Sequence, residues 1–332
     1  MKNKIFFVTG GTGSFGQRFV EIILKKYKAK KVIIFSRDEL KQFQMKNNPI
    51  FKRYIKKMRF FIGDIRDKER LYYAFKQKID YVVHAAALKQ VPIAEYNPYE
   101  AIKTNIIGAQ NLIDVSSEFN IKKVVALSTD KAASPINLYG ATKLASDKLF
   151  VSANNYTKST LYSVVRYGNV FASRGSIVPF FLEKKKNGVI PITDKRMTRF
   201  NISLDEAVDF VVFALNSSVG GELFVPKIPS FRVVDIAKVI APKAKIKIIG
   251  VRPGEKLHEE MITSSDSINT LEFDKFYIII PNSEYFKWNR IKFLKNLKNK
   301  KFKKVKDEFS YNSFNNKHFL SISELTKIIF KK

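Results

Sequence analysis

The sequence predicts an α/β fold: a Rossmann-type, doubly wound parallel sheet with a smaller C-terminal lobe. Over the first two-thirds of the 332 residues, short apolar runs rich in β-branched and aromatic residues alternate with longer amphipathic segments. This alternation is typical of β–α–β crossovers, which place helices on both faces of a parallel sheet. In addition, the glycine-rich stretch TGGTGSFG directly follows the first apolar run, where such sheets carry a turn that a nucleotide can approach.

The first region is expected to contain six strands, of which the first five are each followed by a helix. The strands are predicted at 5–8, 31–36, 58–63, 80–86, 122–128 and 161–168. The helices are predicted at 14–28, 38–47, 67–78, 98–119 and 139–156. The stretch 44–58 is polar, basic and interrupted by Pro49, so we expect a surface excursion there.

After about residue 170 the pattern becomes less regular. Helices are predicted near 177–187, 203–216 and 232–241, and strands at 222–226, 245–250 and 276–281. We therefore expect two domains. Residues 1–170 would form the Rossmann domain with the catalytic residues, and residues 171–332 would form mainly a smaller lobe that closes over a substrate, with some segments returning to the first domain.

Composition excludes several kinds of site. The chain has no cysteine and only three histidines, so we expect no disulfide, no thiolate nucleophile and no metal site. It contains no run of about 18 apolar residues, so no membrane span is expected. The first residues lack a signal-peptide core, and the expected location is the cytoplasm.

The net charge of +30 comes from 60 basic and 30 acidic residues, but only 13 of the basic residues are arginines. Arginine is the preferred residue for recognising bases and phosphates. The lysine excess therefore indicates a bias in usage across the whole chain, and no nucleic acid is expected as a partner. We interpret the lysine-rich run at 292–306 as a solvated basic surface, with a polyanion-binding patch as the alternative.

The glycine-rich loop predicts a dinucleotide site between the first strand and the first helix. Its glycines permit a tight turn, a close approach of backbone N–H groups to a pyrophosphate, and close packing of helix on strand. The helix that follows presents the partial positive charge of its N-terminus to the anion. The residues expected to contact the cofactor here are Gly10, Thr12, Gly13, Ser14, Phe15 and Gly16.

The end of the second strand predicts which cofactor is bound. An acid at this position suits the ribose 2′-hydroxyl of NAD, whereas an arginine suits the 2′-phosphate of NADP. Arg37 stands there, with Ser36 and Lys41 nearby, and the sequence therefore favours NADP. Asp38 is also expected at the cofactor, but it leaves an alternative open because it can cap the next helix instead.

Two later strand ends extend the same site. Asp64 and Ile65 follow the third strand, and Asp64 is expected either to reach the adenine or to cap the next helix. Ala85 and Ala87 follow the fourth strand, where small side chains let a cofactor and a sugar lie close to the backbone. Lys89 is expected to contact cofactor or substrate, and a plain surface lysine is the alternative.

The segment STDKAASPINLYGATK at 128–143 gathers reactive side chains. Tyr139 and Lys143 are four residues apart on a predicted helix and therefore share one face. A neighbouring ammonium and a positive cofactor ring are expected to lower the pKa of the phenol from about 10. This would make Tyr139 a general base for a hydroxyl proton, with Thr129 as a hydrogen-bond partner of the same hydroxyl.

Several motifs together mark a resemblance to known enzymes. TGGTGSFG, STDK and YGATK are similar to the extended short-chain dehydrogenase/reductase superfamily. With SRDELKQ, GDIRD, HAAALKQVPIAEYNP, VVRYGNV, MTRF and RPGEKLHEE, the chain from about residue 4 to residue 280 resembles the inverting UDP-N-acetylglucosamine 4,6-dehydratases. The resemblance implies an NADP-dependent hydro-lyase acting on UDP-N-acetylglucosamine, as the first step of pseudaminic acid biosynthesis for flagellin glycosylation. It also suggests a homo-oligomer.

The same resemblance assigns roles to two further residues. Oxidation at C4 of the sugar acidifies the C5–H; a base removes that proton, an acid protonates the C6 hydroxyl, water leaves, and C6 is reduced. Asp130 is implied as the acid and Lys131 as the base, while related dehydratases that retain the C5 configuration carry Glu in place of Lys131. To act as a base, Lys131 is expected to have a pKa well below about 10.4.

The remaining motifs are expected to bind the nucleotide-sugar. The guanidinium fork matches a diphosphate, and a glutamate can accept hydrogen bonds from ribose hydroxyls. By the resemblance, the substrate-binding residues are Lys89, Asn169, Arg174, Arg199, Arg252 and Glu255.

Alternatives remain at this point. The nearest are a UDP-sugar 4-epimerase and a retaining 4,6-dehydratase of the same fold. From other classes, a basic nucleic-acid-binding protein and a non-catalytic NADP sensor are possible functions, although Asp130, Lys131, Tyr139 and Lys143 all being present argues against both.

Overall fold

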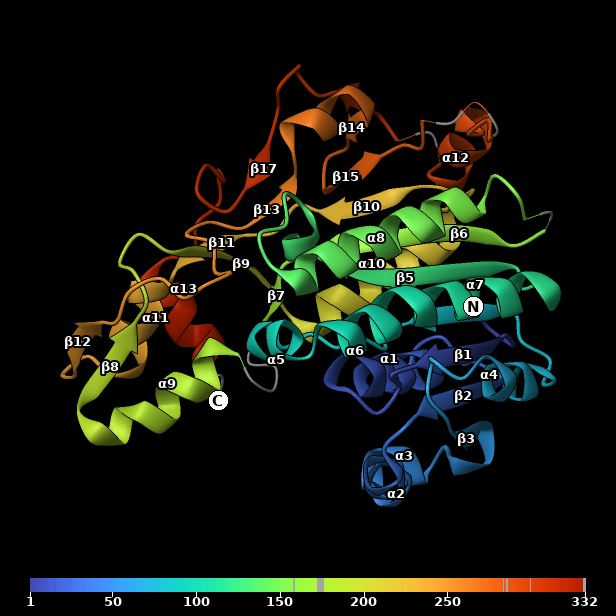
Figure 1. Cartoon of the computed structure of the whole chain (residues 1–332), viewed down its shortest axis with the longest axis horizontal. Coiled ribbons are helices and arrows are strands. Elements are labelled where there is room, and N and C mark those ends of the chain that lie inside the picture. Colours follow the sequence, from blue (N-terminus) through green and yellow to red (C-terminus); the bar gives the residue numbers. More distant parts are fainter. Residues whose placement is uncertain (158, 172–175, 283, 285, 299, 331–332) are drawn as a thin grey trace.

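The structure is a computed structural model that describes residues 1–157, 159–171, 176–282, 284, 286–298 and 300–330 (Figure 1). Within these residues, the largest element is a sheet of ten strands. In spatial order its strands are β16 (Lys303–Lys304), β14 (Thr270–Glu272), β15 (Phe276–Ile279), β10 (Leu223–Pro226), β6 (Leu161–Tyr167), β5 (Lys123–Thr129), β4 (Tyr81–His84), β1 (Ile5–Thr9), β2 (Lys31–Ser36) and β3 (Met58–Ile62).

The pairing of these strands confirms the predicted fold class. The strands from β3 to β10 run parallel, and β15, β14 and β16 continue the sheet in antiparallel pairs. The order β3-β2-β1-β4-β5-β6 is that of a doubly wound sheet. Successive strands are added on one side of β1 up to β3 and on its other side from β4 onward, so the strand order switches between β1 and β4. In such sheets ligands bind beyond the carboxyl ends of the strands at this reversal.

Helices cover both faces of the sheet. On one face α4 (Lys68–Phe75) contacts α7 (Gly108–Glu118), which in turn contacts α8 (Leu138–Ala153). On the other face α1 (Ser14–Lys25) contacts α10 (Leu204–Ser217), which contacts α12 (Arg290–Asn296). The strands between these layers are mostly apolar: β1 is buried along its whole length, and β5 is buried over most of its length.

The six strands predicted in the first region are all present, but two predicted segments differ in detail. The helix expected at 98–119 is divided into α6 (Pro98–Ile102), a π-helical turn (Lys103–Ile107) and α7. The stretch 44–58 contains the end of α2 (Glu39–Asn47), α3 (Pro49–Lys52) and a 3₁₀ turn (Ile55–Lys57). It is more than a surface excursion, because Met45, Phe51 and Met58 are buried in the main core.

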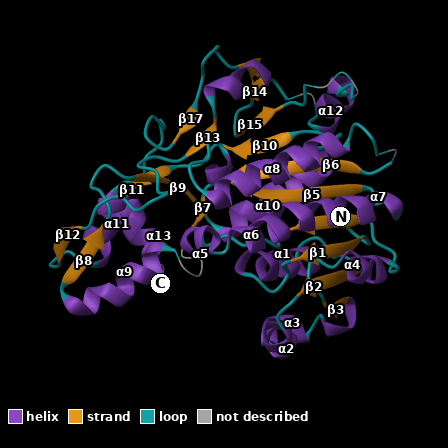
Figure 2. Cartoon of the chain, in the orientation of Figure 1, coloured by secondary structure: helices purple, strands orange, loops and turns teal. Residues whose placement is uncertain are grey.

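A second lobe stands beside the carboxyl ends of the parallel strands (Figure 2). It contains the small sheets β11-β9-β7 (Ser230–Arg232, Thr198–Ile202, Asn169–Val170) and β12-β8 (Lys245–Ile248, Val189–Ile192). Helices α9 (Ile177–Lys184), α11 (Val233–Ile240) and α13 (Ile322–Ile329) pack there around a separate core that includes Phe181, Ile236 and Leu325. Two further elements, α5 (Val91–Tyr96) and the pair β13-β17 (Glu260–Ile262, Tyr311–Asn312), lie near the junction.

Segments from the later half of the chain also complete the main sheet. β10, β15, β14 and β16 all follow residue 170 in sequence, yet they extend the sheet that the first half begins. The two halves of the chain thus share one sheet, and a division into two domains at residue 170 remains a proposal. No helix in the described part of the chain is both long enough and apolar enough to cross a membrane.

Candidate active site

One cavity of about 1440 Å³ lies where the parallel strands end and the second lobe begins. It collects most of the residues that the sequence predicted, although they come from separate motifs. Those that line it are Gly10, Thr12, Gly13, Ser14, Phe15, Gly16, Ser36, Arg37, Asp38, Lys41, Ile65, Ala85, Ala87, Lys89, Thr129, Lys131, Tyr139, Lys143, Asn169, Arg199, Arg252 and Glu255.

The glycine loop has the shape that a pyrophosphate requires. Gly10 has φ +64°, and a Cβ there would lie 2.8 Å from the backbone of Ala85. A Cβ on Gly16 would lie 2.5 Å from the carbonyl oxygen of Gly10. No side chain caps the start of α1 at Gly13, so its first N–H groups are free of a capping side chain and can receive an anion. These residues fit a dinucleotide cofactor.

At the end of β2, the polar side chains are already organised. The Ser36 and Thr12 hydroxyls share a hydrogen bond of 2.7 Å. Asp38 caps α2 by accepting from the Lys41 backbone N–H at 2.9 Å, and its carboxylate also pairs with Lys41 Nζ at 2.6 Å. The structure therefore confirms that Asp38 caps α2 and pairs with Lys41. Asp38 also lines the cavity, so its contact with the cofactor stays a prediction. The Arg37 side chain is half exposed at the rim of the cavity.

Asp64 does not line the cavity, although Gly63 and Ile65 on either side of it do, so its contact with the cofactor stays a prediction. It does not cap α4 either, because Asp67 does so. Its carboxylate instead accepts from the Arg66 backbone N–H at 2.9 Å and from Arg66 Nη2 at 2.8 Å, and lies 3.4 Å from Arg37 Nη1. Although burial opposes it, these hydrogen bonds and charges hold the pKa of Asp64 below its usual range.

The side chains after β5 form a compact charged cluster with Glu259. A 3₁₀ turn, Asp130–Ala132, follows the strand directly and is capped by Thr129. Lys131 Nζ donates to Asp130 Oδ1 at 3.1 Å and lies 2.9 Å from Glu259 Oε1. It also reaches Asn169 Oδ1 at 3.5 Å. The ammonium is thus held between two carboxylates.

The charges of this cluster determine its protonation. Burial alone would lower the pKa of Lys131, but the carboxylates of Asp130 and Glu259 outweigh it and raise that pKa above its usual value. The expectation of a lowered pKa for Lys131 is therefore wrong for the chain alone. Burial raises the pKa of Asp130, even though the Lys131 charge opposes the shift. Asp130 is fully buried and, unlike Lys131, does not line the cavity; its Oδ2 has no hydrogen-bond partner among the described residues.

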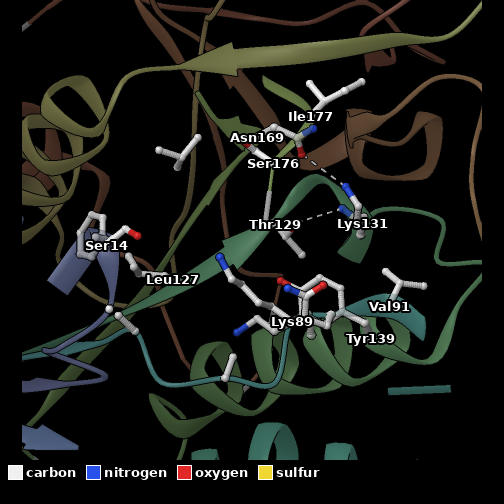
Figure 3. Close-up of a pocket in the computed structure, with 18 of the residues that line it drawn as sticks. Ser14, Lys89, Val91, Leu127, Thr129, Lys131, Tyr139, Asn169, Ser176 and Ile177 are labelled. Atoms are coloured by element: carbon white, nitrogen blue, oxygen red, sulfur yellow. Dashed lines mark hydrogen bonds between the residues drawn. The ribbon is translucent and has the colours of Figure 1, made fainter. Parts of the chain in front are cut away.

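Tyr139 and Lys143 lie on the first turns of α8, whose start is fixed by a cap from Asn137 to the Gly140 N–H at 2.7 Å. Gly140 lets this helix approach the turn after β5, since a Cβ there would lie 2.2 Å from the Lys131 carbonyl oxygen. Figure 3 shows Thr129, Lys131 and Tyr139 facing the same part of the cavity.

The expected lowering of the phenol pKa is not found for the chain alone. Burial raises the pKa of Tyr139 to about 12, while the Lys131 charge and a hydrogen bond with the Thr129 hydroxyl act in the opposite direction. Lys143 is buried, and its burial lowers the pKa of its own ammonium, with the Asp147 carboxylate opposing the shift.

On the substrate side, Arg199 is almost fully committed to its own surroundings. Its Nη1 donates to the carbonyl oxygens of Thr198 and Leu257, and its Nη2 donates to that of Lys256. Lys89, Asn169, Arg252 and Glu255 line the cavity around it. Arg174 lies outside the described residues.

Sequence reasoning missed several residues that line the cavity. Glu259 touches Lys131, and Lys256 reaches the Ala133 carbonyl oxygen at 2.7 Å. Both stand in the RPGEKLHEE motif, which was noticed without a role for either residue. Thr104, in the π-helical turn, lines the cavity with a buried hydroxyl that has no partner, and no pattern in the sequence pointed to it. In the described part of the chain, no three His, Cys, Asp or Glu side chains gather as a metal site would require.

Comparison with known proteins identifies a family and relatives that cover most of the chain. The profile of the polysaccharide biosynthesis protein family matches residues 6–281. A UDP-N-acetylglucosamine 4,6-dehydratase (inverting) from Campylobacter jejuni is 54% identical, covering 98% of this chain and 97% of its own length. A UDP-glucose 4-epimerase from Rickettsia bellii is 41% identical over 83% of each chain.

Solved structures show the same fold. The X-ray structure of Pen from Bacillus thuringiensis matches with a TM-score of 0.87 and 36% identity, covering 99% of this chain and 98% of its own. DesIV, a dTDP-glucose 4,6-dehydratase from Streptomyces venezuelae solved with NAD bound, matches with a TM-score of 0.67 and 21% identity, covering 76% of this chain and 86% of its own.

Proposed function

The chain belongs to the polysaccharide biosynthesis protein family, and from this premise we propose that it is an inverting UDP-N-acetylglucosamine 4,6-dehydratase. The observation that carries the proposal is the position of Lys131, bonded to Asp130 and Glu259 on the wall of the cavity that Tyr139 also lines. A dehydrogenase or an epimerase needs a hydroxyl-proton acceptor. An elimination needs an acid and a base as well, and this cluster supplies both kinds of group.

The first part of the reaction uses the residues of α8 and the end of β5. When bound, a nicotinamide cofactor supplies the acceptor for the hydrogen at C4 of the sugar and later the donor to C6. Tyr139 takes the proton of the C4 hydroxyl, and Thr129, at the end of β5, lines the same cavity and is placed to bond that hydroxyl. Lys143 brings a positive charge to the same helix face, which favours the phenolate.

The second part removes water. Transfer of one proton from Lys131 Nζ to Asp130 across their 3.1 Å hydrogen bond leaves a neutral amine and a neutral carboxylic acid. The raised pKa of Asp130 favours this arrangement, whereas the raised pKa of Lys131 opposes it, so the transfer has to accompany removal of the C5 proton. The amine then takes the C5 proton, and the acid gives its proton to the leaving C6 hydroxyl. One C–H and one C–O bond break, a C5–C6 double bond forms, and one water leaves.

A direct test is to incubate the purified protein with UDP-N-acetylglucosamine, without added cofactor, and to weigh the product. The proposal predicts a product lighter by one water, and in deuterated water a deuteron at C5 with inverted configuration. A product of unchanged mass would contradict it. A dehydrated product that keeps the C5 configuration would support a retaining dehydratase instead.

An epimerase is the second candidate, because a UDP-glucose 4-epimerase is 41% identical over most of the chain. Epimerisation requires no group to expel a hydroxyl. The charged cluster after β5 is the feature that this candidate leaves without a use, and the product mass separates the two functions.

We propose NADP rather than NAD as the cofactor. Arg37 lies at the rim of the cavity beside Ser36 and Lys41, and the nearby acid Asp38 is paired with Lys41. This leaves an arginine fork for a 2′-phosphate. The wider role in pseudaminic acid biosynthesis and flagellin glycosylation is supported by the resemblance of the sequence alone, as is a homo-oligomer.

A further inference from the structure

Glu259 is a buried carboxylate in the cavity for which the reaction above has no use. Its side chain is 2% exposed, and its Oε2 has no hydrogen-bond partner in the described structure. Burying a charge is costly unless it is paired. Its Oε1 lies 2.9 Å from Lys131 Nζ and 3.7 Å from Arg199 Nε, so the carboxylate is stabilised by these two cations.

The backbone of Glu259 is fixed from a distant part of the chain. Its N–H donates to the Ser313 hydroxyl at 3.0 Å, and its carbonyl oxygen accepts from the Ser313 N–H at 2.8 Å. Ser313 is fully buried and also bonds the hydroxyl of Thr198 at 2.7 Å. The C-terminal segment after β17 therefore holds Glu259 in place, and Glu259 in turn meets the end of β5.

We propose that Glu259 is a positioning residue for the dehydration: it holds the Lys131 amine at the cavity wall opposite Asp130, and its negative charge sets the pH range in which this cluster works. The inference rests on the proposed function, because only in the proposed dehydration does Lys131 act as the base that removes the C5 proton. It goes beyond that function by adding a third charged member from a different lobe.

The sign of the effect follows from the charges that face the cluster. Asp130 and Glu259 are the two carboxylates next to Lys131, and Arg199 is the nearest other cation. Glu259 is also faced by Lys256, which Glu260 approaches in turn. The negative charge of Glu259 stabilises every proton held by Asp130 and Lys131. Removing that charge makes each of these protons easier to lose, so both limbs of a pH–rate profile move to lower pH.

The test is the Glu259→Gln variant, which keeps the size of the side chain and removes its charge. We expect its profile of kcat/KM against pH to shift to lower pH by about one unit or more, the size typical of a charge at this distance. Glu259→Asp keeps the charge and should leave the profile in place with a reduced rate. The matched control is Glu260→Gln, because Glu260 bonds Ser134 and does not line the cavity.

A second measurement does not depend on turnover. Labelling of Lys131 with an amine-selective reagent, followed by mass spectrometry across a pH series, reports the fraction of neutral amine. Glu259→Gln should make Lys131 react at lower pH than in the unmodified protein. An unshifted labelling curve and an unshifted rate profile would overturn the role of Glu259. The two proposals can also fail separately. If the unmodified protein performs no dehydration, the proposed function fails. If Lys131 nevertheless reacts at lower pH in Glu259→Gln than in the unmodified protein, the electrostatic role of Glu259 stands.

Discussion

Lys131 is the side chain whose surroundings distinguish this site from a simple dehydrogenase site. Its ammonium meets two carboxylates within 3.1 Å, one from the preceding residue and one from the RPGEKLHEE motif. Both carboxylates stabilise the charged form of the amine, and Asp130 lies within hydrogen-bond distance for the proton transfer proposed above. The Tyr139 phenol lines the same cavity as Lys131. The proposed oxidation at C4 and the proposed loss of water can therefore take place in one site.

The phenol of Tyr139 is predicted to be indispensable for oxidation at C4. Tyr139→Phe removes the oxygen that takes the hydroxyl proton, and we expect kcat to fall roughly 100-fold or more, the usual contribution of a general base. Binding of the UDP-sugar, measured by calorimetry, should change little because the ring remains. A variant with near-normal turnover would remove Tyr139 from the mechanism.

His84 predicts how stability depends on pH. It is buried at the end of β4, with Nδ1 2.8 Å from the Thr9 hydroxyl, and burial lowers its pKa to about 3. Between about pH 6.5 and 3 the histidine is protonated in the unfolded chain but neutral in the folded chain. The free energy of unfolding therefore decreases as the pH falls. The loss should be about 1.4 kcal/mol for each pH unit in this window.

Chemical denaturation at several pH values can check this contribution. In His84→Gln that part of the pH dependence should be absent, whatever the stability of the variant at neutral pH. Equal slopes in the two proteins would contradict a buried, neutral His84.

Much of this residue-scale picture was predictable, because the reactive side chains stand in short motifs at the ends of strands. The protonation states were not. The pKa of Lys131 depends on Glu259, which is 128 positions away in sequence, and Tyr139 is buried by packing with Ala94 and Ala101 from α5 and α6. The sequence likewise left the partners of Asp64 open, and in the structure its carboxylate pairs with Arg66 and Arg37.

Among the elements, the turn from β1 into α1 is the one whose geometry most constrains the sequence. Gly16→Ala would place a Cβ 2.5 Å from the Gly10 carbonyl oxygen and the Gly11 Cα. The loop must move, and we expect the affinity for the dinucleotide to fall about tenfold or more, which corresponds to about 1.4 kcal/mol. Fluorescence titration with reduced cofactor would measure this.

The control for this prediction is Gly188→Ala. Gly188 also has a positive φ, +66°, but nothing lies within 4 Å of the position of its Cβ. This variant should lose a little stability and keep its affinity for the cofactor. If Gly16→Ala bound the cofactor as tightly as Gly188→Ala does, the loop would not be the pyrophosphate site.

At the same scale, the strands and the long helices were predictable from hydrophobic periodicity, and the interruptions were not. The amphipathic pattern over 98–119 is continuous, yet the backbone passes through a π-helical turn at Lys103–Ile107. There Asn105 bonds both the N–H and the carbonyl oxygen of Leu88, at 2.9 Å each. A tertiary hydrogen bond of this kind leaves no trace in local sequence.

For the whole molecule, the lysine-rich run at 292–306 is part of the fold. Apart from Asn299, which lies outside the described residues, it contributes most of α12 and the whole of β16. Its lysines are exposed, while Phe293, Leu297 and Val305 are buried in the main core. The sequence suggested only a basic surface, because five apolar residues spread among many lysines carry a weak periodic signal.

Phe293 tests whether this segment supports the molecule. Its ring lies 5.1 Å from that of Trp288 and 6.2 Å from that of Phe273, and it is fully buried. Phe293→Ala should reduce the free energy of unfolding by about 3–5 kcal/mol, as expected for a large cavity in a packed core. The neighbouring Ile291 is 84% exposed, so Ile291→Ala should leave the melting temperature nearly unchanged. Similar effects of both substitutions would mean that α12 is not docked on the sheet.

The central claim is that Lys131 and its carboxylate partners turn an oxidation site into a dehydration site, and Lys131→Ala tests it most directly. After mixing with UDP-N-acetylglucosamine in deuterated water and quenching with acid, the variant should yield a sugar oxidised at C4, with no deuterium at C5 and no water lost. The unmodified protein should give the dehydrated product with deuterium at C5. Dehydration by the variant at the rate of the unmodified protein would contradict the account.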